Sequence, residues 1–419
     1  MGIQQPTDDQ LQDYGLYVLE QMLQEIGHSL AQWPSMPCST GGWDLHTTNP
    51  LISEQLDYNP QSEHEKAIEK VSQFNADQLD AYNTVIDSIS NKSGQLFFLH
   101  GPAGTGKTYV YNGLCNFVRS KSWVVLEVAS SGISALLIAG GRTAHSMFKI
   151  PIHDLTSTSF CAIPKNSLRA ELIRHTKLII WDEIGPQHRN CAEALDRTCR
   201  DIRNDDRPFG GITVVFGGDF QQTLPVVKGG SRDDIIDACL QQSYLWKNIT
   251  ILSLRINMRL LGTVDVDAED IEFANWLLQV GHGRDMEEDS GEIPLPDSRM
   301  ITHSSEDLVN FIYGDISTNP PPPPEYFLNR TILAARNSDV AEMNKEILQK
   351  MIGETKTYLS ADSLIYEEGA DDPHLRDPNA PPIPSEFLRS INTSSLPPGE
   401  LPLKTGCPVI LLRNLAPSQ

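Results

Sequence analysis

The sequence predicts an α/β protein in which helices cover both faces of a doubly wound parallel sheet. Three observations indicate this fold class. Short, almost wholly apolar segments recur between residues 95 and 219, helical patterns separate them, and glycine-rich turns follow two of them. Continuous apolar strands that alternate with helices are typical of a parallel sheet that is buried on both faces.

Length and composition are those of a globular chain. The 419 residues include 39% hydrophobic and 21% charged side chains, which suits two or three domains of about 150 residues each. No apolar run reaches the ~18 residues of a membrane span, and the start MGIQQPTDDQ has no signal-peptide character. The seven cysteines form no C-x-x-C pair. We therefore expect neither a disulfide scaffold nor a zinc site. The same cysteine pattern suggests that the protein resides in a reducing intracellular compartment.

Charge divides the chain into three parts. Residues 1–73 carry 2 basic and 11 acidic side chains, residues 74–260 carry 20 and 17, and residues 261–419 carry 11 and 27. The formal net charge of −22 argues against non-specific binding to a polyanion, which only the middle part would tolerate. We expect a leader over 1–73, a principal domain over 74–260 and an acidic further domain over 261–419.

The elements follow in chain order. Apolar residues at spacings near three and four predict one helix within residues 1–35, and the turn-rich residues 36–62 predict a linker. A helix that starts near Phe74 leads to a turn at Asn91–Gly94. The predicted strands are Gln95–His100, Val124–Ala129, Lys177–Glu183 and Ile212–Asp219.

After Arg259 the composition becomes acidic and rich in proline. Such segments suit exposed loops or polyproline II spacers. They lie at Asp285–Pro296, Pro320–Pro324 and Glu367–Pro384, and a strand–helix unit over Thr331–Met351 is predicted among them.

The most specific motif is GPAGTGKT, which fits the phosphate-binding pattern G-x-x-x-x-G-K-[ST] between a strand and a helix. Glycines let backbone N–H groups converge on a phosphate, and the helix N-terminus adds partial positive charge. Lys107 is expected to reach the β- and γ-phosphates and the Thr108 hydroxyl to ligate Mg²⁺. The alternative is a glycine-rich turn that merely precedes a helix. The cofactor-binding candidates are Gly101, Pro102, Ala103, Gly104, Thr105, Gly106, Lys107 and Thr108.

Two acids end the apolar strand Ile179-Ile180-Trp181 at the edge of the sheet where ligands bind in such folds. Asp182 is placed to hold Mg²⁺ through water, and Glu183 to polarise the attacking water. The alternative is a solvated strand end.

Two further candidates are weak when read alone. Gln222 follows the strand that ends near Asp219, and a glutamine there can hydrogen-bond a γ-phosphate. Arg259 is a candidate for the transition-state cation that such ATPases use. A solvated glutamine and an ordinary surface arginine are the alternatives.

Together these segments resemble the Pif-type family of 5′→3′ DNA helicases of superfamily 1, group B, and especially its Helitron-associated branch. The resemblance runs from Phe74 to the last residue. It rests on FNADQ (Phe74–Gln78), SSGISALLIAGGRTAHSMFKIP (Ser130–Pro151), EALDRTCRDIR (Glu193–Arg203), PFGG (Pro208–Gly211), GGDFQQTLPVV (Gly217–Val227), LRINMR (Leu254–Arg259), FLRSI and LPLKTGCPVILLRNL (Leu401–Leu415).

The resemblance implies a P-loop NTPase with a RecA-like motor domain 1A and a small 1B insertion over 74–260. It implies a partial second RecA-like lobe, 2A, over 261–419 that ends at the start of an SH3-like insertion. ATP and Mg²⁺ are the implied cofactors, single-stranded DNA is the implied partner, and no membrane is involved. The implied roles are those of DNA repair, recombination and telomere maintenance.

The resemblance also assigns residues. It implies that Gln78 reads adenine, that Gln222 senses the γ-phosphate and that Arg259 is an arginine finger. The single-stranded DNA candidates are Ser131, Arg142, Thr143 and His145, with Phe148 and Lys149 beside them. For His145 and Phe148, a role as ordinary core residues is an equal alternative.

Three features depart from the family's pattern. The second motif reads DEIGPQHR in place of an Ala-Pro-Met step, and Gln221 stands where the family has arginine. The chain ends at Gln419, before the family's motifs V and VI. Because translocation needs two lobes that close and open, and a supplied arginine is worth ~10³-fold or more in rate, we expect slow hydrolysis and poor unwinding by this chain alone.

Three functions remain open from the sequence: an ATP-dependent DNA helicase, a nucleotide-binding protein without motor activity, and an unrelated P-loop ATPase that acts on proteins. The GRTAH and PFGG segments disfavour the third, because phosphate binding alone needs neither. We expect an intracellular protein located in the nucleus, with the mitochondrion as the alternative.

Overall fold

The computed structural model describes residues 7–25, 28–33, 35–39, 49–136, 138, 141–152, 155–261, 268–283, 292–293, 302, 304–318, 321–361 and 399–409. The chain forms two compact units, Met1–Ile293 and Pro294–Gln419, and each is described here by itself. Among the described residues, no helix combines the length and apolar character that crossing a bilayer requires.

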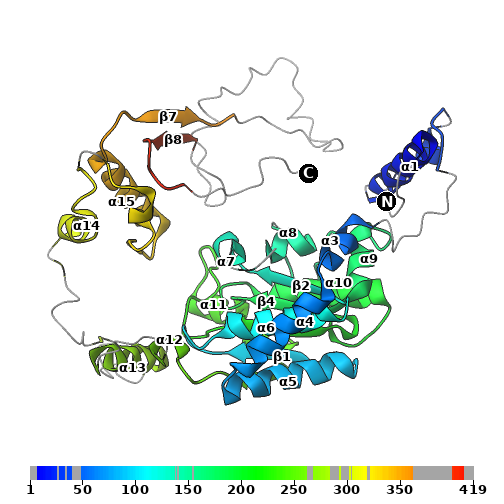
Figure 1. Ribbon diagram of the computed structural model, residues 1–419, viewed down its shortest axis with the longest axis horizontal. Coiled ribbons are helices and arrows are strands. Elements are labelled where there is room, and N and C mark those ends of the chain that lie inside the picture. Colours follow the sequence, from blue (N-terminus) through cyan, green and yellow to red (C-terminus); the bar gives the residue numbers. More distant parts are fainter. Residues whose placement is uncertain are drawn as a thin grey trace. The chain divides into compact units, whose positions relative to one another are not determined.

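A six-stranded sheet forms the centre of the first unit (Figure 1). The strand order is β3-β2-β4-β5-β1-β6, and every neighbouring pair is parallel. The predicted α/β class with a doubly wound, RecA-like parallel sheet is thereby confirmed. The strands are β1 (Leu96–His100), β2 (Val124–Ala129), β3 (Arg142–Thr143), β4 (Thr176–Asp182), β5 (Thr213–Gly218) and β6 (Ile249–Ser253).

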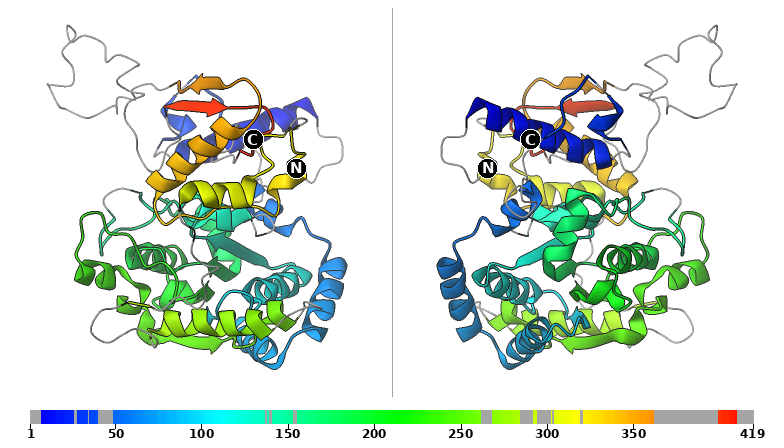
Figure 2. Two further views of the ribbon diagram at one scale, coloured as in Figure 1. Left: turned by 90° about the vertical axis from the view of Figure 1, so that its left-hand side faces the viewer. Right: turned by 90° about the vertical axis from the view of Figure 1, so that its right-hand side faces the viewer.

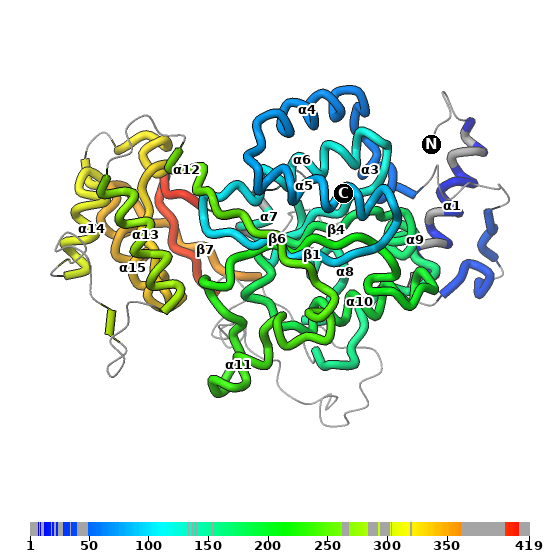
Figure 3. The backbone as a smooth tube through the Cα atoms, turned by 90° about the horizontal axis from the view of Figure 1, so that it is seen from below, coloured from blue at the N-terminus to red at the C-terminus, as the bar shows by residue number. Residues whose placement is uncertain are grey.

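Helices cover both faces of this sheet, as the apolar strands predict (Figure 3). Successive strand residues point to opposite faces. Phe97 and Leu99 of β1 therefore join the core under α5 and α6, whereas Phe98 joins the core under α8, α9 and α10. These helices are α5 (Ala76–Ser90), α6 (Lys107–Ser120), α8 (Ala144–Phe148), α9 (Leu168–His175) and α10 (Arg189–Arg203).

The remaining elements of the first unit are short or lie outside the two layers. They are α1 (Asp8–Glu25), η1 (Leu30–Gln32), α3 (Pro50–Leu56), α4 (Pro60–Ser72), α7 (Gly132–Leu136), η2 (Pro208–Gly211), α11 (Arg232–Ala238), η3 (Leu240–Gln242), η4 (Trp246–Asn248), α12 (Met258–Leu261) and α13 (Ala268–His282).

The linker predicted over residues 36–62 is wrong from Asn49 onward. Asn49 is fully buried, caps α3 and donates a hydrogen bond through Nδ2 to the Leu168 carbonyl at 2.9 Å. Ile52 on the next turn belongs to the core of the sheet. Asn–Pro is a turn sequence, but asparagine at the N-cap with proline at the first helical position also begins a helix.

Two strands of the first unit and both strands of the second unit were not predicted, and one predicted strand is absent. The edge strands β3 and β6 were missed. In the second unit, residues 331–334 form no strand, although the helix expected after them is present as α15. The spacer Glu367–Pro384 lies outside the described residues.

The second unit contains helices and a small antiparallel sheet (Figure 2). Strands β7 and β8 pair from Lys356 opposite Leu403 to Leu359 opposite Glu400. Within residues 302–409, the described parts show no parallel strand pair, so the partial second RecA-like lobe stays a prediction. The elements are α14 (Ser305–Tyr313), η6 (Pro324–Phe327), α15 (Asn337–Lys350), β7 (Lys356–Leu359) and β8 (Glu400–Leu403).

Candidate functional site

Four of the predicted site segments follow strand ends at one edge of the sheet. Gly101 follows β1, Ser131 follows β2, Asp182 ends β4 and Asp219 follows β5. Because the strands are parallel, their carboxyl ends share an edge, where open α/β sheets bind ligands. Strand β5 lies between β1 and β4. Its last residues therefore lie between the glycine-rich loop and the two acids, an order that the sequence does not reveal.

The glycine-rich loop has the backbone that phosphate binding needs. Gly104 and Gly106 adopt φ of 84° and 85°, a left-handed conformation that glycine accepts without strain. A Cβ on Gly106 would lie 2.5 Å from Nε2 of Gln78, so the position is also closed to larger residues. Helix α6 begins at Lys107, and its N-cap Gly106 has no side chain to bond the first amides. Those amides are available to an anion.

Gln78 supports the glycine-rich loop through a hydrogen bond to Thr105. It is 1% exposed, its Oε1 accepts from the Asn75 amide at 3.1 Å, and its Nε2 donates to the Thr105 carbonyl at 3.0 Å. These two bonds leave the amide one further donor and one further acceptor position. The adenine-reading role of Gln78 stays a prediction, and the structure adds a second role, in which Gln78 braces the loop.

Arg259 lies beside the loop at Gly104. The amides of Met258 and Arg259 donate to the Gly104 carbonyl at 2.9 and 3.3 Å. A Cβ on Gly104 would lie 2.5 Å from Oδ1 of Asn257. The segment after β6 therefore packs directly on the phosphate loop and presents the exposed Arg259 there.

Lys107, Asp182 and Glu183 form one electrostatic group. Lys107 Nζ donates to the Gly101 carbonyl at 2.6 Å, and Asp182 Oδ1 accepts from the Glu183 amide at 3.0 Å. Burial raises the pKa of Asp182, against the lowering effects of the Glu183 amide, Lys107 and Tyr111. Burial, and then the charge of Asp182, raise the pKa of Glu183, while Lys107 lowers it.

The backbone of Glu183 is strained. Its φ of 52° lies in the left-handed region, which non-glycine residues rarely adopt. The turn is held because the next amide, of Ile184, donates to the Gly217 carbonyl at 3.0 Å. Strain of this kind concentrates at functional sites.

These pKa shifts predict a pH-dependent stability cost. Carboxyl groups whose folded pKa is raised stabilise the fold most below their ordinary values of 3.8 and 4.5, and this contribution is lost as pH rises through the folded pKa. Asp182→Asn is therefore expected to raise the melting temperature at pH 7 by about 1–3 °C. Near pH 4 the gain over wild type should shrink. Calorimetry at both pH values checks this, and a variant that is less stable than wild type at pH 7 contradicts it.

Three site residues were not predicted. Asp219 is 7% exposed, and its Oδ1 accepts from the Gln221 amide at 3.0 Å. Its Oδ2 accepts from Gln222 Nε2 at 3.4 Å, so Asp219 holds the predicted phosphate-sensing glutamine. His100, whose pKa burial lowers, ends β1 and interacts with Asp219. Tyr111 lies on α6 near Asp182. An acid at a strand end was a usable signal for Asp219, whereas an apolar-patterned helix gives none for Tyr111.

The DNA candidates lie at the other end of the same edge, after β2, in β3 and at the start of α8. The Ser131 hydroxyl accepts from the Ser134 amide at 3.1 Å, and Thr143 Oγ1 caps α8 by accepting from Ser146. Arg142 pairs with Glu54 at 2.7 Å, with 40% of its side chain exposed. Burial lowers the pKa of His145.

The structure corrects the suggestion that Phe148 contacts DNA. Its side chain is 0% exposed, and its ring lies 6.1 Å from that of Trp181 in the core. It therefore cannot stack on a base, and the core alternative holds. Lys149, the next residue, is exposed at the C-cap of α8.

The protein oxygens at this site suit a magnesium ion whose coordination is completed by the phosphates of a bound nucleotide. Among the described residues, no three or more His, Cys, Asp and Glu side chains gather into a metal-binding group. Mg²⁺ is commonly held by one or two protein oxygens together with substrate phosphates. The exposed Thr108 at the start of α6 and the buried Asp182 carboxylate offer such oxygens.

A cavity of about 370 Å³ lies elsewhere, between α4 and α6. Tyr58, Tyr109, Asn116 and Arg119 are among its lining residues, and none of the Gly101–Thr108 loop is. The cavity and the phosphate loop are therefore separate features.

Comparison with known proteins was made on the whole chain. Residues 73–291 match the family described as PIF1-like helicase, and residues 386–419 match the 2B domain of the DNA helicase Pif1. The match over 386–419 includes the segment that the sequence predicted to open an insertion in the second lobe; most of it lies outside the described residues.

Individual relatives agree with these matches. The chain is 28% identical over 332 residues to the ATP-dependent DNA helicase Pif1 of Psychrobacter sp., covering 79% of this chain and 43% of that protein. It is 24% identical over 399 residues to the ATP-dependent DNA helicase PIF1 of Emericella nidulans, covering 91% and 46%. The chain thus spans less than half the length of these two relatives.

A solved structure supports the fold. The crystal structure of Pif1 helicase from Candida albicans aligns with a TM-score of 0.52 at 23% sequence identity, over 79% of this chain and 63% of that chain.

Proposed function

Since the chain belongs to the PIF1-like helicase family, we propose that it is an ATP-dependent DNA helicase that couples Mg–ATP hydrolysis to 5′→3′ movement on single-stranded DNA and to duplex unwinding. One observation carries the proposal. The Gly101–Thr108 loop, the Asp182–Glu183 pair and the Asp219–Gln222 turn follow strands β1, β4 and β5, which are neighbours in the sheet and end at one edge.

Each group at this edge has a role in phosphoryl transfer. The amides at the start of α6 and the Lys107 amine bind the phosphate oxygens. The Thr108 hydroxyl and Asp182 would hold Mg²⁺, which, when bound, neutralises charge on the phosphates. Glu183 takes a proton from the attacking water, and its raised pKa makes it a better base than an exposed glutamate.

The remaining residues sense the γ-phosphate, supply positive charge to the reacting phosphate and support the loop. Gln222, held by Asp219, hydrogen-bonds the γ-phosphate and changes partner when it leaves. Arg259 supplies positive charge from beside Gly104. Gln78 both braces the loop and reads adenine through its remaining donor and acceptor.

Single-stranded DNA binds at the β2–β3 end of the same edge. Ser131, Arg142, Thr143 and His145 contact it, mainly through phosphates, because motor proteins read the strand without base specificity. Arg142 must leave Glu54 to do so, and exposed ion pairs of this kind are weak enough to exchange.

The domain assignment and location follow the same proposal. We assign 74–260 to motor domain 1A with a small 1B insertion, 261–419 to part of 2A, and 1–73 to a leader whose last helices pack on 1A. The nucleus is the proposed location, with the mitochondrion as the alternative.

The test is the ATPase rate with and without single-stranded DNA. Wild type is expected to hydrolyse ATP slowly without DNA and to be stimulated at least about tenfold by an oligonucleotide, since DNA bound to the first lobe and the partial second lobe favours the closed site. Lys107→Ala should lose both basal and stimulated hydrolysis, because the amine is the only side-chain cation of the loop. Wild type that binds nucleotide but gains nothing from DNA contradicts the helicase proposal and favours a nucleotide-binding protein without motor activity.

A further inference from the structure

Tyr111 is a fully buried tyrosine one helical turn after Lys107. Its side chain is 0% exposed, and its ring lies in the core shared by α5, α6 and the sheet. The hydroxyl end points away from that apolar cluster, toward the carboxyl ends of β4 and β5. A Cβ on Gly217 of β5 would overlap the Tyr111 hydroxyl and would lie 3.0 Å from Oδ1 of Asp182. The hydroxyl thus occupies the space above Gly217, beside the carboxylate.

The hydroxyl forms no hydrogen bond of good geometry with the described residues. A buried hydroxyl needs a partner, because full burial separates it from bulk water. Burial raises the pKa of Tyr111 well above its ordinary value, and the largest charge acting on it is that of Asp182. The neutral hydroxyl is therefore a donor next to a carboxylate, and hydrogen bonds in sites without substrate are often long until the site closes.

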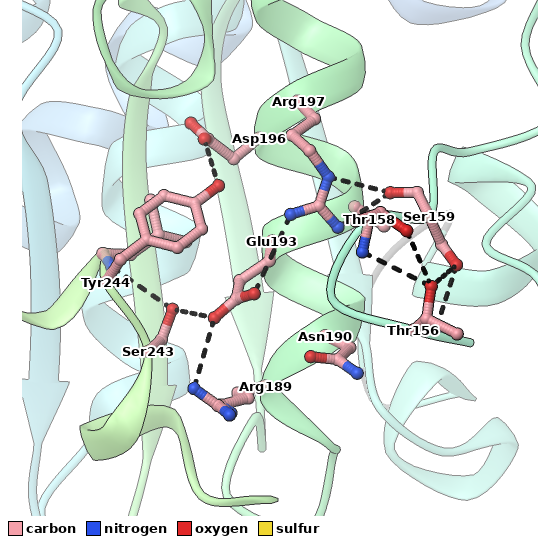
Figure 4. Close-up of polar contacts among 12 residues, drawn as sticks. Thr156, Thr158, Ser159, Arg189, Asn190, Glu193, Asp196, Arg197, Ser243 and Tyr244 are labelled. Atoms are coloured by element: carbon pink, nitrogen blue, oxygen red, sulfur yellow. Dashed lines mark hydrogen bonds and ion pairs between the residues drawn. The ribbon is translucent and has the colours of Figure 1, made fainter.

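A tyrosine that donates a well-formed hydrogen bond to an aspartate occurs elsewhere in this unit. Tyr244 donates to Oδ2 of Asp196 at 2.7 Å, and that aspartate is likewise buried at the sheet's helical cover (Figure 4). Asp196 also accepts from the Phe209 amide at 2.6 Å, so its carboxylate is fixed by several donors. The Asp182 side chain, by contrast, has one hydrogen bond of good geometry within the described part of the chain, from the Glu183 amide to Oδ1.

We propose that Tyr111 is a positioning residue for Asp182, whose hydroxyl bonds Oδ1 when the site closes on nucleotide. With the Glu183 amide and Tyr111 both on Oδ1, the carboxylate is held in one rotation, and Oδ2 is left as the oxygen that would hold Mg²⁺ through water. Outer-shell bonds of this kind orient metal-binding carboxylates. Gly217 is part of the same arrangement, because any side chain there would displace the hydroxyl. The inference rests on the proposed use of Mg–ATP.

The test is the magnesium dependence of nucleotide binding, which does not require turnover. Fluorescence of mant-ATP is followed while MgCl₂ is titrated into wild type, Tyr111→Phe and Tyr82→Phe. Tyr82 is a matched control, since it is a buried aromatic residue in the same core, 7% exposed, and lies on α5 away from Asp182. For Tyr111→Phe, the Mg²⁺ concentration at half-saturation should rise about 3- to 10-fold. For Tyr82→Phe it should stay at the wild-type value.

A second variant, combined with Tyr111→Phe, tests the same hydrogen bond by non-additivity. Gly217→Ala should raise the half-saturating Mg²⁺ concentration in wild type and should add less in the Tyr111→Phe background, because both changes remove the same bond. An unchanged magnesium dependence in Tyr111→Phe overturns the inference, and so does an equal shift in Tyr82→Phe. Wild type that fails to bind mant-ATP in any Mg²⁺ concentration overturns the proposed function instead.

Discussion

Replacing Glu183 by glutamine is expected to lower ATP turnover by about 10²- to 10⁴-fold and to leave nucleotide affinity within a few-fold of wild type. Glutamine keeps the size of the side chain but cannot take a proton from the attacking water. The phosphate loop, Lys107 and Asp182 are untouched, so binding should persist. Steady-state hydrolysis with single-stranded DNA present gives the first quantity, and mant-ATP titration gives the second.

Glu127→Gln is the matched control for this variant. Glu127 lies on β2, is 6% exposed, and has a pKa raised by burial, as Glu183 does. Its carboxylate accepts a hydrogen bond from the Cys115 thiol at 3.3 Å and has no place in the proposed chemistry. Its neutralisation should leave turnover within about twofold of wild type. Retention of more than a tenth of the turnover by Glu183→Gln would show that another group is the base.

The central strands could be predicted from the sequence, and the edge strands could not. Strands β1, β2, β4 and β5 are buried on both faces and appear as continuous apolar runs. Strand β6 has Ile251 at 53% exposure and a mixed pattern, and β3 has only two residues. Sequence patterns report burial, so elements that are half-exposed or very short give little signal.

The residues that carry the chemistry of the site could be predicted from the sequence, but the residues that hold them in place could not. The phosphate loop and the two acids can be identified in the sequence from their residue types and from their positions after predicted strands. The neighbours of that group depend on strand order, which places β5 between β1 and β4. For that reason the role of Gly217 and the contact between Asp219 and Gln222 appear only in three dimensions. Tyr111 looks like any apolar helix position, and Gln78 looks like a nucleotide reader although it also braces the loop.

Helix α10 supports the face of the sheet behind the site, and Asp196 is its central polar residue (Figure 4). Its side chain accepts from the Phe209 amide at 2.6 Å, from the Tyr244 hydroxyl at 2.7 Å and from Arg200 Nε at 3.0 Å. Asp196 is 0% exposed, and Phe209, with a strained φ of 51°, depends on this bond to keep its turn. These contacts tie the PFGG segment to α10.

Asp196→Ala is therefore expected to lower the free energy of unfolding by about 3–5 kcal/mol, because it leaves a buried amide, a hydroxyl and a guanidinium without their acceptor. The melting temperature should fall by roughly 10 °C. Denaturant titration followed by circular dichroism gives the free energy.

Asp201→Ala on the same helix is the control for this loss. Asp201 pairs with Lys165 at 2.8 Å, but both side chains are about half exposed, at 52% and 48%. Exposed pairs contribute about 0–1 kcal/mol, so this variant should stay close to wild type. If the two variants lose similar stability, the buried network around Asp196 does not hold the PFGG turn, and the apolar contacts of Phe209 must hold it instead. Because only residues 184–188 separate Glu183 from α10, a real loss at Asp196 should also lower the ATPase rate through the loosened turn between them.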